Sequence, residues 1–245
     1  MAKHHATCAI VGAGDYIGSA IARKFASEGF TVFAGRRNVE KLGALKAEID
    51  EAGGRLEARK LDARKEEEVK AFLEEADRTA PLEVVIANPG GNVNFPVLET
   101  TERVFFKVWE MACKAGFLTG REAARLMLAR GKGSIFFTGA TASLRGGAGY
   151  AAFASAKAGL RMVAQSMARE LGSRNIHVAH LVIDAAVDTA FVRERIRAAR
   201  GSDAKIPDGA LMEPASVAEA YWLLHNQDRD AWTFEMDLRP FGEKW

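Results

Sequence analysis

A tyrosine and a lysine stand seven residues apart in the stretch GYAAFASAK, residues 149–157. Phenol and ammonium groups can both exchange protons with a reacting substrate. On a helix, residues seven apart return to nearly the same face, so Tyr150 and Lys157 are expected on one stripe. Phe153 lies between them on that stripe and has no hydroxyl. The pair predicts proton transfer with Tyr150 as the acid; the alternative is that Tyr150 only packs at the rim of a pocket.

Three glycines follow the first apolar run of the chain. The segment IVGAGDYIGSAIA places Gly12, Gly14 and Gly18 between an expected strand and an expected helix. Glycine lets the backbone turn tightly and approach a pyrophosphate, and the N–H groups at a helix start attract the anion. The spacing is one residue longer than the common dinucleotide fingerprint. A glycine turn can also serve plain chain reversal, but its position after the first strand favours nucleotide binding.

The kind of dinucleotide is indicated at the end of the second apolar run. That run ends FAGRRN, with Arg36 and Arg37 where an acidic residue would hold the ribose hydroxyls. The planar fork of a guanidinium matches a 2′-phosphate. The alternative is that two surface arginines begin a helix. The missing acid favours NADP(H) over NAD(H).

Elements that could position these residues alternate along the chain. Short apolar runs separated by helical patterns are typical of βαβ units on a parallel sheet. We therefore predict an α/β fold, a single-domain Rossmann-type doubly wound parallel sheet of about seven strands with helices on both faces, over residues 1–245. The expected strands cover 7–11, 31–35, 56–61, 82–88, 133–139, 176–184 and part of the tail 231–245, and the expected helices cover 16–29, 39–54, 66–78, 101–130 and 150–172.

A basic segment interrupts this alternation after the sixth expected strand. Residues 185–213 carry several arginines and are predicted to form a lid-like insertion over a ligand. The alternative is a solvated helix face.

Composition restricts the class of protein. A net charge of +2 over 245 residues argues against broad nucleic-acid binding. The longest apolar runs are strand-sized, and none approaches the roughly 20 residues of a membrane helix. With two cysteines and no signal-peptide pattern, no disulfide framework is indicated and a cytoplasmic location is expected. No metal-site spacing emerges. A small-molecule substrate, with no nucleic acid and no membrane as partner, is the expectation.

The order of these features resembles the short-chain dehydrogenase/reductase superfamily over nearly the whole chain. Members carry a glycine turn, an aspartate after the third strand, an N-N-A-G-type run after the fourth, a Y-x-x-x-K helix, and a threonine after the sixth strand. Tyr16 stands where the family has its middle glycine, and the family's P-G before Thr189 is absent. The resemblance implies a cofactor site of Gly12, Gly14, Tyr16, Ile17, Gly18, Arg36, Arg37, Asp62, Asn88, Gly90, Lys157 and Thr189.

The catalytic positions depart from the family pattern. The resemblance implies a tyrosine that passes a proton, a lysine that lowers its pKa and bonds the nicotinamide ribose, a serine that orients substrate, and an asparagine that supports a water relay. Lys157 fills the lysine position. Phe153 stands at the tyrosine position, Ala140 at the serine position, and Ala112 or Cys113 at the asparagine position.

Two possibilities exist for replacing the missing tyrosine and serine hydroxyls. The Y-x6-K spacing of Tyr150 is similar to that of divergent bacterial enoyl-acyl-carrier-protein reductases in the same superfamily. Alternatively, the hydroxyls of Thr138, Thr141 or Ser143 orient the substrate, although threonines after a strand are common.

Two aspartates near the end of the sixth expected strand are further candidates. Asp184 or Asp188 could be a general acid if its pKa were raised. A helix N-cap is the other role for at least one of them.

The sequence thus predicts an enzyme, a short-chain type oxidoreductase that binds NADP(H). It would transfer hydride to or from a small carbonyl, alcohol or activated double bond with a non-standard proton donor. The alternative is a catalytically inactive dinucleotide-binding protein that acts as a sensor or complex partner. The resemblance also implies a homodimer or homotetramer formed through the helices expected at 101–130 and 150–172.

Overall fold

One parallel sheet of seven strands organises the protein. The structure, a computed structural model, describes residues 5–201 and 205–243. The strand order is β3-β2-β1-β4-β5-β6-β7 and every neighbouring pair is parallel, which confirms the predicted doubly wound α/β fold. The strands are β1 Thr7–Val11, β2 Thr31–Arg36, β3 Arg55–Lys60, β4 Leu82–Ala87, β5 Gly133–Thr138, β6 Ile176–Ile183 and β7 Glu235–Leu238.

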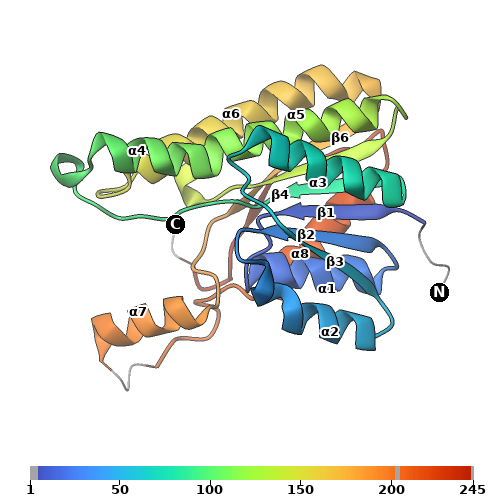
Figure 1. Ribbon diagram of the computed structural model, residues 1–245. Coiled ribbons are helices and arrows are strands. Elements are labelled where there is room, and N and C mark those ends of the chain that lie inside the picture. The colour runs from blue at the N-terminus through green and yellow to red at the C-terminus, as the bar shows by residue number, and fades with distance from the viewer. Residues whose placement is uncertain (1–4, 202–204, 244–245) are drawn as a thin grey trace.

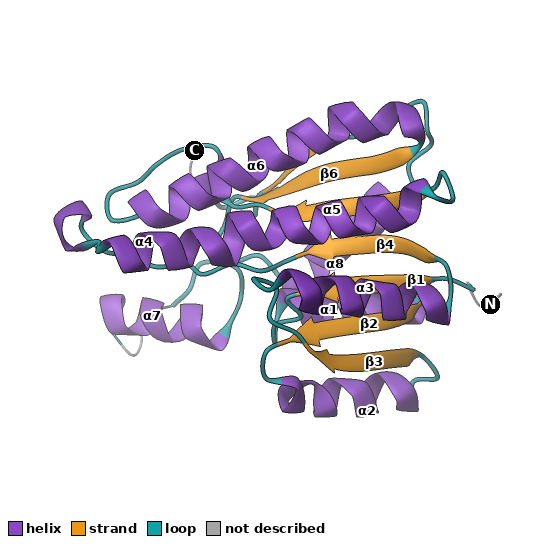
Figure 2. Ribbon diagram, turned by 45° about the horizontal axis from the view of Figure 1, so that its top comes forward, coloured by secondary structure: helices purple, strands orange, loops and turns teal. Residues whose placement is uncertain are grey.

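Helices cover both faces of this sheet (Figures 1 and 2). Because the central strands are apolar on both sides, each face needs its own layer of helices. One core holds Phe25, Leu45 and Tyr221, and the other holds Phe72 and Leu160. The first face is covered by α1 Ile17–Ser27, α2 Gly43–Glu51 and α8 Pro214–His225, and the second by α3 Glu66–Thr79, α5 Ala115–Leu128 and α6 Ala151–Leu171. Short 3-10 turns cover Val39–Leu42, Val97–Glu99, Thr141–Ser143 and Gly172–Arg174.

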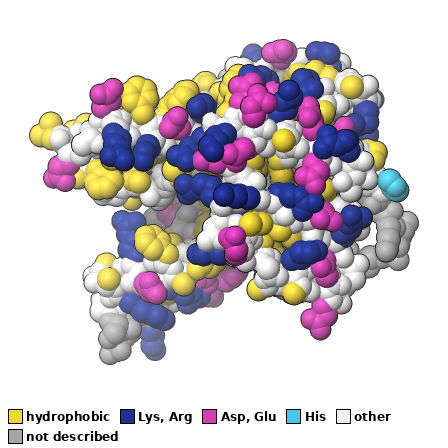
Figure 3. Space-filling model, viewed as in Figure 1, with side chains coloured by type: hydrophobic (Ala, Val, Ile, Leu, Met, Phe, Trp, Pro, Cys, Tyr) yellow, Lys and Arg dark blue, Asp and Glu magenta, His cyan; other side chains and the backbone are white. Residues whose placement is uncertain are grey.

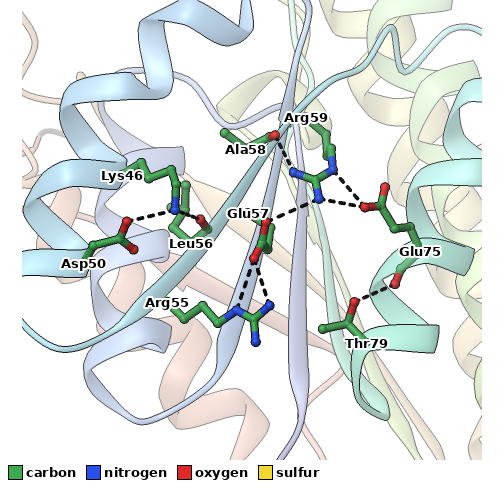
Figure 4. A network of polar contacts seen from close by, with 9 residues as sticks. All are labelled: Lys46, Asp50, Arg55, Leu56, Glu57, Ala58, Arg59, Glu75 and Thr79. Carbon is green, nitrogen blue, oxygen red and sulfur yellow. Dashed lines mark hydrogen bonds and ion pairs between the residues drawn. The ribbon is translucent and has the colours of Figure 1, made fainter.

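Charged side chains protect the edge strand β3 (Figure 4). Arg59 donates two hydrogen bonds of 2.7 and 3.0 Å to Glu75 on α3, and Arg55 bonds Glu57 on its own strand. The Arg59 guanidinium also lies 5.6 Å from the centre of the Phe33 ring. Charges along an exposed strand oppose pairing with another chain.

The prediction of one continuous helix over 101–130 is wrong in one respect. The structure divides it into α4 Glu102–Trp109, a π-helical turn Glu110–Lys114, and α5. Ala112 and Cys113, at the asparagine position of the resembled family, lie buried in this turn. Such turns occur frequently at functional sites.

The segment 185–213 contains a helix, α7 Ala190–Arg200, that stands apart from the sheet and its covering helices in Figures 1 and 2. Residues 202–204 of this segment lie outside the described residues. A bridge between Val187 and Met212 joins the two ends of the segment. Helix α8, which the sequence patterns had not indicated, follows at Pro214, where proline at the first helical position is favourable.

No helix in the described part of the chain combines the length and the apolar character needed to cross a membrane.

Candidate active site

Two adjoining cavities lie at the carboxyl ends of the strands, where open parallel sheets bind ligands. The larger is about 680 Å³ and the smaller about 350 Å³. In Figure 3 the surface is indented between the part that carries α4 and the part that carries α7. Of the residues expected to bind cofactor, the larger cavity is lined by Gly14, Tyr16, Ile17, Gly18, Asn88, Gly90, Lys157 and Thr189, and the smaller by Gly12, Gly14, Arg36, Arg37, Asp62, Asn88 and Gly90.

The three glycines of the first loop differ in how much space a Cβ atom would have at each position. Gly12 has a φ of +87°, and a Cβ there would lie 2.8 Å from the nitrogen of Pro89. A Cβ on Gly18 would lie 2.7 Å from the Cα of Ala13. A Cβ on Gly14 would meet nothing within 4 Å, although Gly14 lines both cavities. Packing therefore requires glycine at 12 and 18, whereas glycine at 14 keeps open the space where the cavities join.

Tyr16 connects this loop to the segment that carries α7. Its hydroxyl accepts a hydrogen bond of 3.0 Å from the backbone N–H of Ala190. The neighbouring Thr189 is the N-cap of α7, because its hydroxyl accepts from the N–H of Val192 at 3.0 Å. The N-cap role considered for at least one of Asp184 and Asp188 is therefore wrong, since Asp184 directly follows β6 and no helix begins in the described stretch between it and α7. Sequence patterns could not show the Tyr16 contact, since it joins residues that are far apart in the chain.

The smaller cavity is lined by charged side chains. Asp62 accepts two hydrogen bonds from the guanidinium of Arg64, at 2.9 and 2.6 Å. These bonds, helped by the charge of Arg37, outweigh the opposing effect of burial and lower the pKa of Asp62 to about 2. Arg36 donates to Asp15 in the glycine loop. Within residues 5–201 and 205–243, Arg37 forms no salt bridge, so its charge stays available to a ligand.

Residues after β4 join the glycine loop to the lysine. The side-chain amide of Asn88 donates a 2.8 Å hydrogen bond to the carbonyl of Gly12. A Cβ on Gly90 would lie 3.4 Å from Nζ of Lys157. The absence of a side chain at Gly90 therefore leaves room for the ammonium group.

Lys157 is the buried cation of the larger cavity. Its side chain comes from α6, and its Nζ donates a 2.7 Å hydrogen bond to the carbonyl of Thr138 at the end of β5. Burial lowers the pKa of Lys157 to about 8. An amine with a pKa near neutrality can both give and take a proton at physiological pH. The ring of Phe153 lies 5.9 Å from Nζ.

Tyr150 lies in the same cavity, one turn before Phe153. It is half-buried and immediately precedes α6. The loop before it is held by a 2.9 Å hydrogen bond from the N–H of Phe95 to the carbonyl of Gly149. The structure thus brings Tyr150 and Lys157 to one cavity.

Phe153, Ala140 and one of the two candidates for the asparagine position belong to one apolar cluster. Ala112 and Phe153 are buried members of it, and Ala140 and Tyr150 pack against it, whereas Cys113, the other candidate, is not part of this cluster. These apolar replacements therefore lie together in the fold.

The three hydroxyls considered as substitutes already have protein partners. Oγ1 of Thr138 lies 2.7 Å from the hydroxyl of Tyr221 on α8. Thr141 donates to the carboxylate of Asp184, and Ser143 accepts from the backbone N–H of Ala140 at 3.1 Å. Thr138 and Thr141 line the larger cavity, whereas Ser143 does not.

The general-acid hypothesis for Asp184 and Asp188 is contradicted. Burial alone would raise the pKa of Asp184, but hydrogen bonds from Thr141 and Arg239 outweigh it and the pKa is lowered. The pKa of Asp188 is lowered by its hydrogen bonds from Arg193. A general acid requires the opposite shift.

Known proteins share this fold and sequence pattern. A family model described as short chain dehydrogenase matches residues 6–200. The chain is 26% identical over 223 residues to 3-oxoacyl-[acyl-carrier-protein] reductase FabG of Thermotoga maritima, covering 90% of each protein. It is 31% identical over 182 residues to 3beta-hydroxysteroid dehydrogenase of Mediterraneibacter gnavus, covering 74% of this chain and 65% of that protein.

Solved structures show the same similarity. The crystal structure of a short-chain dehydrogenase from Rhodopseudomonas palustris has 64% identity and a TM-score of 0.85, covering 97% of this chain and 100% of that one. A metagenomic short-chain oxidoreductase, crystallised in complex with NADP, has 25% identity and a TM-score of 0.83, covering 98% of this chain and 99% of that one.

Proposed function

Because the chain belongs to the short-chain dehydrogenase family of oxidoreductases, we propose that it transfers hydride between NADP(H) and a small carbonyl, alcohol or activated double bond. The observation that carries this proposal is the placement of Lys157. Its buried ammonium group shares a cavity with the glycine loop, whose Gly14 leaves space for a diphosphate. A protein that only packs its core has no need of an uncompensated buried cation beside an open loop.

The residues of the two cavities fit a dinucleotide. Gly14 and the start of α1 would hold the diphosphate, and Lys157 the nicotinamide ribose. Asp62 would face the adenine and Arg37 the 2′-phosphate. When bound, the nicotinamide supplies or accepts the hydride. The metagenomic relative with NADP supports the choice of cofactor.

Replacing Arg37 with alanine is expected to weaken NADPH binding by about 10- to 100-fold, because a charge-assisted hydrogen bond contributes about 1.5–3 kcal/mol. NADH affinity should change little, since NADH has no 2′-phosphate. Fluorescence titration with each dinucleotide measures both effects. Arg169→Ala on the exposed side of α6 is the control, and an equal loss for NADH would contradict the assignment.

Side chains of the protein would transfer the proton to the substrate. We propose that the hydroxyl of Tyr150 donates it to the substrate oxygen, with Lys157 supplying positive charge that stabilises the phenolate. Both side chains line the larger cavity. The apolar cluster around Phe153 offers no hydroxyl at the position where a tyrosine stands in the resembled family.

Steady-state oxidation of NADPH with a panel of ketones, aldehydes and enones tests this function. The wild-type protein is expected to turn over at least one class. Tyr150→Phe should lower kcat/KM by about 100-fold, the lower end of what general acids contribute, because water can reach an open cleft. Phe95→Leu, a change in the adjacent loop, is the control. Unchanged turnover in Tyr150→Phe would remove the tyrosine from the mechanism.

A second function is favoured by a specific observation. Since the tyrosine and serine positions of the resembled family hold Phe153 and Ala140, which line the larger cavity without a side-chain hydroxyl, the chain could bind the dinucleotide as a sensor or complex partner without hydride transfer. Calorimetric binding of NADPH together with no turnover of any panel compound would support it. Turnover that depends on Tyr150 would exclude it.

Four further expectations accompany the proposal. We infer one cytoplasmic domain in which residues 185–213 act as a lid. The half-exposed apolar residues of α4, α5 and α6 would form a homodimer or homotetramer interface. They are Phe106, Trp109, Phe117 and Met162.

A further inference from the structure

A buried histidine lies behind the cavity on β6. The side chain of His180 is fully buried, and its Nδ1 lies 3.0 Å from Oε2 of Glu235 on β7. Arg161 of α6 donates two hydrogen bonds to the same carboxylate, at 2.6 and 2.8 Å. These bonds lower the pKa of Glu235 and keep it ionised. A carboxylate only accepts hydrogen bonds, so His180 carries its proton on Nδ1 and presents a lone pair at Nε2.

That lone pair lacks a partner. Nε2 of His180 is buried and has no hydrogen-bond partner among the described residues. An unsatisfied buried acceptor costs about 1–3 kcal/mol, so its retention calls for a reason. The ring fills the space beside Gly139, where a Cβ would lie 2.4 Å from Nε2. Gly139 itself lines the larger cavity.

Lys157 is bound to the residue that precedes Gly139. Its Nζ donates a hydrogen bond to the carbonyl of Thr138, the residue immediately before Gly139. An ammonium group has three N–H donors, and Thr138 uses one. Burial lowers the pKa of His180 to about 4; the charge of Glu235 opposes this shift, and the charges of Lys157 and Arg161 add to it. At neutral pH His180 is therefore an uncharged acceptor next to a charged donor.

We propose that His180, oriented by Glu235 and Arg161, is a positioning residue for Lys157. Its Nε2 accepts a hydrogen bond from the lysine ammonium through one buried water molecule. Such a water needs two to four polar partners. The groups proposed for this role are Nε2 of His180, Nζ of Lys157 and the carbonyl of Thr138. A hydrogen bond to the charged form favours that form, so His180 opposes the effect of burial on Lys157. Its role in turnover rests on the proposed function, whereas the link itself does not.

The link is tested by ¹⁵N NMR of the histidine side chains of the full chain without cofactor. Below a pH of about 8, Lys157 is protonated and donates; above it, the donor charge is lost. We expect the Nε2 shift of His180 to follow a titration with its midpoint near that pH, although His180 itself titrates near pH 4. The inflection should vanish in Lys157→Met.

His177 is the matched control. It lies on the same strand and is also buried. Its Nε2 lies 2.9 Å from the carbonyl of Thr233, and its Nδ1, like Nε2 of His180, has no hydrogen-bond partner among the described residues. Its nitrogens should show no inflection near pH 8. A flat Nε2 curve for His180 in the wild-type protein, or the same inflection in Lys157→Met, would overturn the proposal.

The role in turnover is tested separately with His180→Gln and His177→Gln. His180→Gln should move the midpoint of the pH profile for NADPH oxidation to lower pH by about one unit, a tenfold change in proton affinity. His177→Gln should leave it in place, and an equal shift in both variants would refute the positioning role. A wild-type protein without turnover would refute the proposed function, and the NMR titration would still decide whether His180 is linked to Lys157.

Discussion

Replacing Gly14 with valine is expected to weaken NADPH binding severely while the protein stays folded. A Cβ at this position meets nothing within 4 Å, and the backbone is not in the left-handed region, so the fold accepts a larger residue. The side chain would instead occupy the space where the two cavities join. Because the diphosphate must approach the backbone there, we expect a loss of about 10³-fold in affinity, or about 4 kcal/mol.

Isothermal titration with NADPH measures the loss, and thermal unfolding without cofactor checks the fold. Gly43→Val is the control, since a Cβ at Gly43 also meets nothing within 4 Å and lies away from both cavities. By contrast, Gly18→Val should destabilise the protein itself, because its Cβ would collide with backbone atoms. Retention of NADPH affinity in Gly14→Val would mean that the diphosphate does not lie at this loop.

Features encoded by neighbouring residues could be predicted from the sequence. The glycine turn and Lys157 depend on spacing within one βα unit or one helix, and both lie in the cleft as expected. Strand positions could be predicted because strands buried on both faces appear as continuous apolar runs. The π-helical turn at Glu110–Lys114 could not, since a single turn of this kind within a longer helix has no residue pattern of its own.

Contacts between distant segments explain the rest of what the sequence could not show. Tyr16 reaches Ala190, and His180 meets Glu235 and Arg161, only because the sheet places these segments side by side. The sequence signal for His180 was weak: it is one of two histidines in an otherwise apolar strand. Its partner could not be identified, because pairing between β6 and β7 depends on the whole sheet.

Lys157→Met is expected to remove nearly all turnover, by about 10³- to 10⁴-fold in kcat/KM. Among the described residues that line the cavity, Lys157 carries the only buried ammonium group, and the substitution removes the charge that we propose to stabilise a phenolate at Tyr150. Methionine has a similar length and suits an apolar site. Because burying the lysine charge is unfavourable, as its lowered pKa shows, the variant should melt no lower than the wild-type protein.

In Lys157→Met, the chemical step should be slowed much more than NADPH binding is weakened. Gly14 and Arg37 remain in place to bind the other parts of the dinucleotide, so the dissociation constant for NADPH should rise by less than about tenfold, within what one hydrogen bond contributes. Lys132→Met, an exposed lysine paired with Glu83, is the control and should retain full activity. Stopped-flow measurement of NADPH oxidation in a single turnover separates the chemical step from binding. If Lys157→Met oxidised NADPH at more than a tenth of the wild-type rate, the proton would have to come from a group other than the Tyr150–Lys157 pair.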